Sequence, residues 1–240
     1  IFERQGEDDL LVYDADDEGA SELVRSARSV LHPVSASPLP EGGSGVEGGR
    51  LHLPGFSVPL EDLGSADPAH LGDMAAAAVL ALDRRAVPEG VESVLRSFRP
   101  GSHRRQVVAT IGGVDYVDDS KATNPHAALA AIAAYPSVVL IAGGLAKGLD
   151  LRPLARAANV KAVVGIGTAG PDLVAEAGER GHLAGTLDEA VRVASRLAEP
   201  GDTVLLAPGA ASFDQFQSYA ARGEAFAEAV ARLDKEELRS

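Results

Sequence analysis

Short apolar runs recur along the second half of the chain, separated by segments with helical spacing. The runs that suit buried strands are residues 107–111, 114–117, 138–142, 160–166 and 203–206. The helical segments are residues 125–134, 151–158, 171–179, 187–197 and 213–238, the last of which is one helix or a broken pair. Strands that alternate with helices predict an α/β fold, with a mostly parallel sheet covered on both faces.

The first hundred residues follow a less regular pattern. We expect a strand at residues 10–13, a helix at 21–31, a loop or hairpin tip at 38–50, edge β structure at 51–60 and helices at 69–82 and 87–98. Two prolines interrupt the stretch 51–60, which is why we place it at a sheet edge. Pro100-Gly101 then breaks the pattern, so we divide the chain into domains at residues 1–99 and 100–240.

Composition narrows the possible functions. The 240 residues are 45% apolar and 24% charged, which is typical of a soluble globular protein. A formal net charge of -13 repels phosphate backbones and argues against general nucleic-acid binding. The chain has no cysteine, which excludes disulfides and thiolate metal sites and favours the cytoplasm. No apolar run reaches the ~18 residues of a membrane span, so we expect no membrane partner.

Four polar segments lie at predicted strand ends, at residues 103–105, 118–125, 143–148 and 208–216. Three of them follow a strand, and the loops after parallel strands lie along one edge of a sheet, where ligands usually bind. These loops would bring together two lysines and two hydroxyls, those of Lys121, Lys147, Thr123 and Ser212. Together with free N–H groups at helix starts, they predict a site for carboxylates or phosphates.

Each of these residues also has an ordinary structural interpretation. Ser212 and Asn124 suit helix N-caps, and a single lysine in a loop is usually just solvated. His126 suits a structural role, and His70 suits a capping role or a contact between domains. Because two lysines and two hydroxyls converge on one predicted edge, we favour a binding site over these separate interpretations.

The segment Gly165–Gly170 reads G-I-G-T-A-G between a predicted strand and a predicted helix, as in a dinucleotide-binding turn. The acidic pair Asp188 and Glu189 follows about 20 residues on, but it lies at a helix start instead of a strand end. We therefore favour a small-residue turn and keep a nicotinamide-dependent oxidoreductase as an alternative. The sequence contains no GxxxxGK[ST] phosphate loop and no histidine pair with metal-binding spacing.

Residues 119–125 read D-S-K-A-T-N-P, which resembles the muramyl ligase family and in particular its members that add D-glutamate. Residues 143–147, with two glycines and a lysine, and residues 211–223 match two further family segments in the same order. Residues 1–3 and the acidic turn at 16–17 resemble the family's central domain. The resemblance spans the chain and is strongest beyond residue 100.

The resemblance implies a partial central ATPase-type domain over residues 1–99 and a complete, Rossmann-like domain over residues 100–240 that binds an amino acid. In the family, ATP phosphorylates the alanyl carboxylate of UDP-linked muramyl-alanine, and the amine of D-glutamate attacks the acyl phosphate. The implied cofactors and partners are therefore ATP, magnesium, D-glutamate and the UDP-linked precursor. We expect a monomeric, cytoplasmic enzyme of cell-wall synthesis.

The resemblance also implies roles for individual residues. The D-glutamate site would consist of Lys121, Thr123, Lys147, Ser212 and Phe213, with Tyr219 nearby. The nucleotide would meet Arg104 and Asp119. On the helix that contacts adenine the family usually shows His-Asn and a second Asn, whereas this sequence offers His70 and Asp73.

The same resemblance implies that the phosphate loop, the magnesium ligands and a modified lysine lie upstream of residue 1. We therefore expect that the true N-terminus is missing and that the chain holds no catalytic residue and no metal site. We also expect that the 240 residues alone neither hydrolyse ATP nor form the amide bond. Two further alternatives are a non-catalytic amino-acid-binding module and a sibling ligase such as a folylpolyglutamate synthase; the D-S-K-A-T-N run argues against the sibling.

Overall fold

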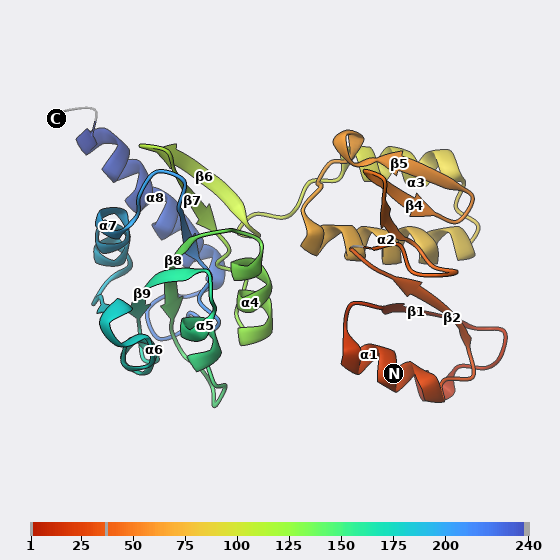
Figure 1. Cartoon of the computed structure of the whole chain (residues 1–240), viewed down its shortest axis with the longest axis horizontal. Coiled ribbons are helices and arrows are strands. Elements are labelled where there is room, and N and C mark those ends of the chain that lie inside the picture. The colour runs from red at the N-terminus through yellow and green to blue at the C-terminus, as the bar shows by residue number, and fades with distance from the viewer. Residues whose placement is uncertain (1, 37, 238–240) are drawn as a thin grey trace. The chain divides into compact units, whose positions relative to one another are not determined.

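The computed structural model describes residues 2–36 and 38–237, and the chain forms two compact units, residues 1–100 and 101–240 (Figure 1). The division coincides with Pro100-Gly101, where the helical pattern breaks. Each unit has a hydrophobic core of its own. Among the described residues, no helix combines the length and the apolar character that crossing a membrane requires.

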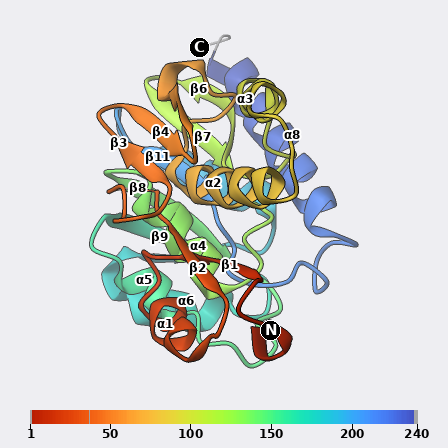
Figure 2. The same ribbon diagram turned by 90° about the vertical axis from the view of Figure 1, so that its right-hand side faces the viewer.

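The N-terminal unit combines two small sheets with helices. Its elements are β1 (Leu10–Asp14), α1 (Glu18–Leu23), β2 (Val30–Val34), β3 (Gly45–Glu47), β4 (Arg50–Leu53), β5 (Phe56–Pro59), α2 (Pro68–Asp83) and α3 (Pro88–Ser97). β1 and β2 pair in parallel, whereas β3, β4 and β5 form an antiparallel sheet. Figure 2 shows α2 alongside β3 and β4, and α2 and α3 share a core with β4 and β5.

The helix expected at residues 21–31 is wrong in its second half. Asp17 caps α1 by accepting the Ala20 N–H at 2.9 Å, and α1 ends at Leu23. The apolar run that begins at Val30 forms β2 instead, because its backbone pairs with β1. A pairing partner distant in sequence overrides the local helical spacing here.

The edge strand expected at residues 51–60 is in fact two strands of an antiparallel hairpin. β4 lies between β3 and β5, so it is a central strand. Pro54-Gly55 supplies the turn, with Gly55 at φ +86°, a left-handed conformation that glycine adopts without steric cost. Pro59 ends β5 at the sheet edge, where a missing N–H is tolerated.

The C-terminal unit is a six-stranded α/β layer structure. Its elements are β6 (Gln106–Ile111), β7 (Val114–Asp118), α4 (Pro125–Ala133), β8 (Val138–Gly143), α5 (Arg152–Arg156), β9 (Val160–Ile166), α6 (Gly170–Ala177), β10 (Gly181–Leu183), α7 (Leu187–Leu197), β11 (Thr203–Leu206) and α8 (Tyr219–Glu237). The strand order is β10-β9-β8-β11-β7-β6, and only β6 is antiparallel to its neighbour. The predicted α/β fold with a mostly parallel sheet is confirmed.

Helices cover both faces of this sheet. α4, α5 and α6 share a core with one face, and α7 and α8 with the other, as Figure 1 shows. Alternate residues of β8 serve the two cores: Leu140 points to the first and Ile141 to the second, and both are fully buried. Burial of each such side chain stabilises the fold by about 1.5–3 kcal/mol, so a central strand must be apolar at every position.

Two details of this unit differ from expectation. The short strand β10, at the outer edge of the sheet, was not expected from the sequence pattern. The helix expected from residue 213 begins only at Tyr219, while its expected end at Leu238 lies outside the described residues. The segment 213–218 is held out of the helix by contacts to other loops, described below.

Candidate functional site

The candidate site lies where three central strands of the sheet end. β11 lies between β8 and β7 and is parallel to both, so that Leu206 pairs with Asp118 on one side and with Ile141 on the other. The loops that follow these strands therefore begin side by side. They contain residues 119–124, 144–148 and 207–218, the segments that the sequence pattern singles out.

Backbone hydrogen bonds hold the three loops together. The Gly209 N–H donates to the Ala122 carbonyl at 2.9 Å, which joins the loop after β11 to the loop after β7. Leu145 and Ala211 exchange N–H···O bonds of 2.8 and 3.1 Å, which join the loop after β11 to the loop after β8. The central loop thus fixes the spacing between the other two.

Arg222, on the first turn of α8, also links the loops after β7 and β11. Its side chain is 1% exposed and donates to Ser120 Oγ at 2.9 Å, to the Ser120 carbonyl at 2.9 Å and to the Ala210 carbonyl at 3.2 Å. Burial lowers the pKa of this guanidinium to about 10, so it stays charged at neutral pH. A buried cation therefore lies beneath the loops that carry the two lysines.

The two predicted lysines each lie against an aromatic ring. Lys121 Nζ lies 3.8 Å from the centroid of the Tyr219 ring, and Lys147 Nζ lies 5.3 Å from the centroid of Phe213. Within residues 2–36 and 38–237, neither ammonium group forms an ion pair or a hydrogen bond with another side chain. Both charges thus remain available to an anionic ligand.

The two predicted hydroxyls belong to the same loops. Ser212 is 3% exposed, and its carbonyl accepts the N–H groups of Gln215 and Phe216. The Thr123 N–H donates to the Lys121 carbonyl at 2.8 Å, which makes a tight turn. In the described part of the chain, neither side-chain hydroxyl has a protein partner. Ser212 is therefore not the N-cap of α8, which starts seven residues later at Tyr219.

Several residues with an unfavourable backbone conformation lie at the same edge of the sheet. Among residues 101–237, three non-glycine residues have positive φ: His103 at 64°, Arg105 at 44° and Lys147 at 52°. Such conformations cost roughly 1–3 kcal/mol each and persist where the surroundings hold them in place. All three lie in segments that the sequence pattern assigns to the site.

The carboxylates next to Lys121 are engaged elsewhere. Asp118 accepts His103 Nδ1 at 2.7 Å and the Ser120 N–H at 2.9 Å, and Asp119 accepts the Arg105 N–H at 3.2 Å. Burial raises the pKa of Asp119 to about 6, against the opposing effects of that hydrogen bond and of the nearby arginine charge. Arg104, the other residue predicted to meet a nucleotide, is exposed beside it.

Asp119→Asn is expected to stabilise the C-terminal unit above about pH 6 by roughly 1–3 kcal/mol. The folded-state pKa exceeds the unfolded one, so ionising Asp119 opposes folding above about pH 6, and this cost disappears as the pH falls toward about 4. Asparagine keeps an oxygen acceptor for Arg105. Hydrogen exchange of the β7 and β11 amides at both pH values measures the difference.

Exposed Glu179 provides the control, since Glu179→Gln should leave the exchange free energies unchanged at both pH values. An Asp119→Asn variant with the parental stability at neutral pH would contradict the expectation.

The G-I-G-T-A-G turn is filled by a carboxylate of the chain itself. Asp214 Oδ2 accepts the Thr168 N–H at 2.8 Å and Thr168 Oγ1 at 3.2 Å. A Cβ atom at Gly167 would clash with this carboxylate. The glycines thus allow the close approach of an internal anion, which argues against a dinucleotide pyrophosphate at the turn. The same contact explains why residues 213–218 do not form a helix.

The acidic pair that follows the turn is also engaged. Glu189 accepts the Gly185 N–H at 2.9 Å, and Asp188 pairs with Arg192 and Arg232. Both carboxylates already have partners within the chain, which argues against their being the ribose ligand of a dinucleotide site.

The two remaining predicted residues lie in the N-terminal unit. Asp73 lines a pocket of about 190 Å³ together with Tyr13, Asp16 and Pro68, at the carboxyl ends of β1 and β2. His70 lies outside the lining of this pocket: its Nδ1 lies 3.0 Å from Ser65 Oγ and its ring meets Phe98 edge-on. Asp73, and not His70, therefore lines this pocket.

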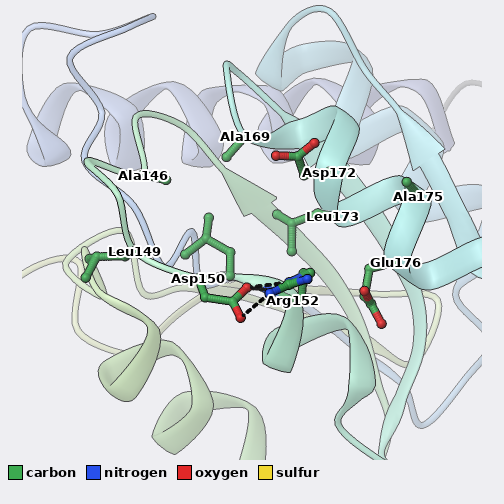
Figure 3. A pocket seen from close by; sticks show the side chains of 10 residues that line it. Ala146, Leu149, Asp150, Arg152, Ala169, Asp172, Leu173, Ala175 and Glu176 are labelled. Atoms are coloured by element: carbon green, nitrogen blue, oxygen red, sulfur yellow. Dashed lines mark hydrogen bonds and ion pairs between the residues drawn. The ribbon is translucent and has the colours of Figure 1, made fainter.

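A second groove of about 480 Å³ lies between α5 and α6, beside the loop after β8 (Figure 3). Asp150 and Arg152 form a two-bond ion pair inside it, at 2.8 and 2.9 Å, and Glu176 pairs with Arg156. None of the individual ligand-contacting residues predicted from the sequence lines this groove, although Ala146, from the predicted segment 143–148, does. Within the described residues, no group of three histidine or acidic side chains is arranged to hold a metal ion.

Some contributors were not assigned a role from the sequence. Arg222 lies in a matched segment, but its spacing does not indicate that its side chain binds two loops. The hydrogen-bond partners of His103 and Asp214 are residues distant in sequence. The signal in the sequence is the helical spacing of Arg222 with Phe226 and Val230, which places this arginine on the buried face of α8.

Comparisons with known proteins identify this unit. Residues 103–210 match the family model described as "Mur ligase, glutamate ligase domain". The C-terminal unit belongs to the Mur ligase family. All three loops of the candidate site begin within the matched residues, and the D-S-K-A-T-N-P segment lies inside them.

The Mur ligase resemblance extends over most of the chain. The chain is 43% identical over 232 residues to a UDP-N-acetylmuramoylalanine–D-glutamate ligase of Frankia casuarinae. The matched region covers 91% of this chain and 49% of the relative. A protein of the same name from Thermobifida fusca is 48% identical over 191 residues, covering 72% and 40%. The chain spans about half the length of the curated relatives it matches.

Solved Mur ligases have a similar fold. MurF from Acinetobacter baumannii superposes with a TM-score of 0.64 at 18% identity, covering 91% of this chain and 51% of that protein. At this level of identity the similarity concerns the fold alone.

Proposed function

We propose that this chain takes part in the ATP-dependent joining of D-glutamate to UDP-N-acetylmuramoyl-L-alanine, and that its C-terminal unit binds the D-glutamate. One observation supports this most directly: two ammonium groups without carboxylate partners in the described chain, and two hydroxyls, occupy loops at the ends of adjacent parallel strands. The relatives that match most of the chain carry the name of this ligase.

The side chains present suit a dicarboxylic amino acid. D-Glutamate has two carboxylates, and Lys121 and Lys147 offer one ammonium group for each. Thr123 and Ser212 add hydroxyl donors. Charge-assisted hydrogen bonds are the strong ones in proteins, and Arg222 beneath the loops adds a positive potential that favours anions. Holding both carboxylates leaves the amine as the free, reactive group.

The proposed reaction has two steps. The γ-phosphoryl group of ATP passes to the alanyl carboxylate of the precursor, and ADP leaves. The neutral amine of D-glutamate then attacks the carbonyl carbon of the acyl phosphate; the C–O bond to phosphate breaks, and the nitrogen loses a proton. Binding by this unit contributes proximity and orientation to the second step.

The nucleotide is proposed to meet Arg104 and Asp119 at the same sheet edge of the C-terminal unit. Exposed Arg104 offers a fixed cation to phosphate, and carboxylates suit ribose hydroxyls. Magnesium is proposed to accompany ATP, as it does with nucleoside triphosphates in general. The UDP-linked substrate implies that the enzyme acts in the cytoplasm, in cell-wall precursor synthesis.

Titration of the 240-residue chain with D-glutamate, followed by NMR, tests the proposal. We expect saturable shifts at the loops after β7, β8 and β11, with weaker binding of L-glutamate and of D-alanine, which lacks the second carboxylate. If D-glutamate leaves these signals unchanged, the proposal is wrong. If D-alanine binds equally well, the two-lysine arrangement is wrong.

A further inference from the structure

The ammonium groups of Lys121 and Lys147 have a different kind of neighbour from the ammonium group of Lys161 in the same unit. Lys161 of this unit pairs with two carboxylates, those of Glu199 and Asp202, at 2.8 and 2.9 Å. Lys121 and Lys147 instead face aromatic rings that come from one segment, residues 213–219. The contact of Lys121 with Tyr219 is the closer of the two.

We propose that Tyr219 is a positioning residue that holds the Lys121 ammonium group over its ring face before substrate binds. This inference rests on the proposed function, because the group being positioned is the proposed ligand of a D-glutamate carboxylate. It assigns the ring of Tyr219 a role through Lys121 instead of a direct contact with the amino acid.

A ring is suited to this task in a way that a carboxylate is not. The face of an aromatic ring attracts a cation through its quadrupole, but it accepts no strong hydrogen bond and carries no net charge. A carboxylate partner would neutralise Lys121 and compete with the substrate's carboxylate for its N–H donors. Over a ring, the side chain loses rotational freedom in advance while its donors remain free, which lowers the entropic cost of binding.

The ring itself is anchored in the frame of the site. The Tyr219 carbonyl accepts Ser120 Oγ at 2.8 Å, so the backbone of Tyr219 is tied to the residue next to Lys121. His103 meets the ring edge-on, with centroids 6.2 Å apart and planes at 78°. His103 is in turn held by Asp118 at 2.7 Å. The ring is thus fixed by the loop that carries the lysine it faces.

The second pair provides an internal comparison. Phe213 is 65% exposed, Lys147 is exposed, and their 5.3 Å separation is longer than the 3.8 Å of the first pair. Cation–π attraction weakens with distance and with solvent exposure. Removing the Phe213 ring should therefore affect ligand binding less than removing the Tyr219 ring.

The contact can be observed without ligand. Protons above a ring face shift upfield, and the sequence contains only four lysines, Lys121, Lys147, Lys161 and Lys235, so selective labelling with ¹³C-lysine resolves each one. We expect upfield-shifted ε-methylene protons for Lys121 in the parent chain, retained in Tyr219→Phe and lost in Tyr219→Leu. Lys161, held by carboxylates, is the reference and should not change.

The same variants are then titrated with D-glutamate. Tyr219→Leu is expected to weaken binding roughly 2- to 30-fold, and Tyr219→Phe to restore most of the affinity, because the ring face and not the hydroxyl is required. Phe213→Leu should weaken binding less than Tyr219→Leu.

The outcomes separate this inference from the function on which it rests. A parent chain that does not bind D-glutamate refutes the proposed function. A parent chain that binds D-glutamate but shows no upfield shift for Lys121, or a Tyr219→Leu variant with the parental shift and affinity, refutes the role of Tyr219 alone. If Tyr219→Leu does not fold, the shift in the parent chain and in Tyr219→Phe still decides the question.

Discussion

Arg222→Met is expected to lower the free energy of unfolding of the C-terminal unit by roughly 2–4 kcal/mol. Methionine has a similar length but leaves Ser120 and the Ala210 carbonyl without their donors. Each buried acceptor without a partner costs about 1–3 kcal/mol. Removing a buried charge partly offsets this loss, because burial disfavours the charged form of Arg222, as its lowered pKa reflects.

Hydrogen exchange of the β7 and β11 amides measures this effect in the C-terminal unit alone. Arg232→Met is the matched control: Arg232 lies on the same helix but is half exposed and pairs with Asp188 at the surface, so its loss should cost less than about 1 kcal/mol. Arg222→Lys should fall between the two, because it keeps the charge but not the fork of donors. Equal losses for Arg222→Met and Arg232→Met would mean that Arg222 does not hold the loops together.

Lys121→Ala and Lys147→Ala are each expected to weaken D-glutamate binding roughly ten- to a hundred-fold. A hydrogen bond to a charged group is worth about 1.5–3 kcal/mol, and about 1.4 kcal/mol corresponds to a factor of ten. Because Lys147 has φ +52°, a conformation that costs lysine and alanine alike, Lys147→Ala removes the charge at unchanged backbone strain, and Lys147→Gly removes both. Both Lys147 variants should lose affinity to a similar extent.

The measurement is an NMR or calorimetric titration of each variant with D-glutamate. Lys161→Ala is the control, because Lys161 lies on β9 and its charge is already paired with Glu199 and Asp202. It should bind D-glutamate as the parent chain does. Parental affinity in both Lys121→Ala and Lys147→Ala would exclude the proposed carboxylate ligands.

Part of this protein follows directly from the order of its residues. Strands such as β8 and β11 are buried on both faces, so they must be apolar throughout, and that requirement is visible without a structure. The chirality of parallel crossovers then puts the polar loops after β7, β8 and β11 along one edge. The placement of Lys121, Lys147, Thr123 and Ser212 in neighbouring loops was thus predictable from periodicity and topology.

What only the tertiary structure decided depends on partners far apart in the chain. Val30 forms a strand because β1 is there to pair with it, and residues 213–218 stay out of a helix because Asp214 binds Thr168. Arg222 becomes the buried link between two loops, and Tyr219 comes to face Lys121, through contacts about a hundred residues apart along the chain. The local spacing of apolar residues indicates which side of a helix or strand is buried. It does not indicate which distant residue will form the hydrogen bonds of a buried polar side chain, because that depends on how the whole unit packs.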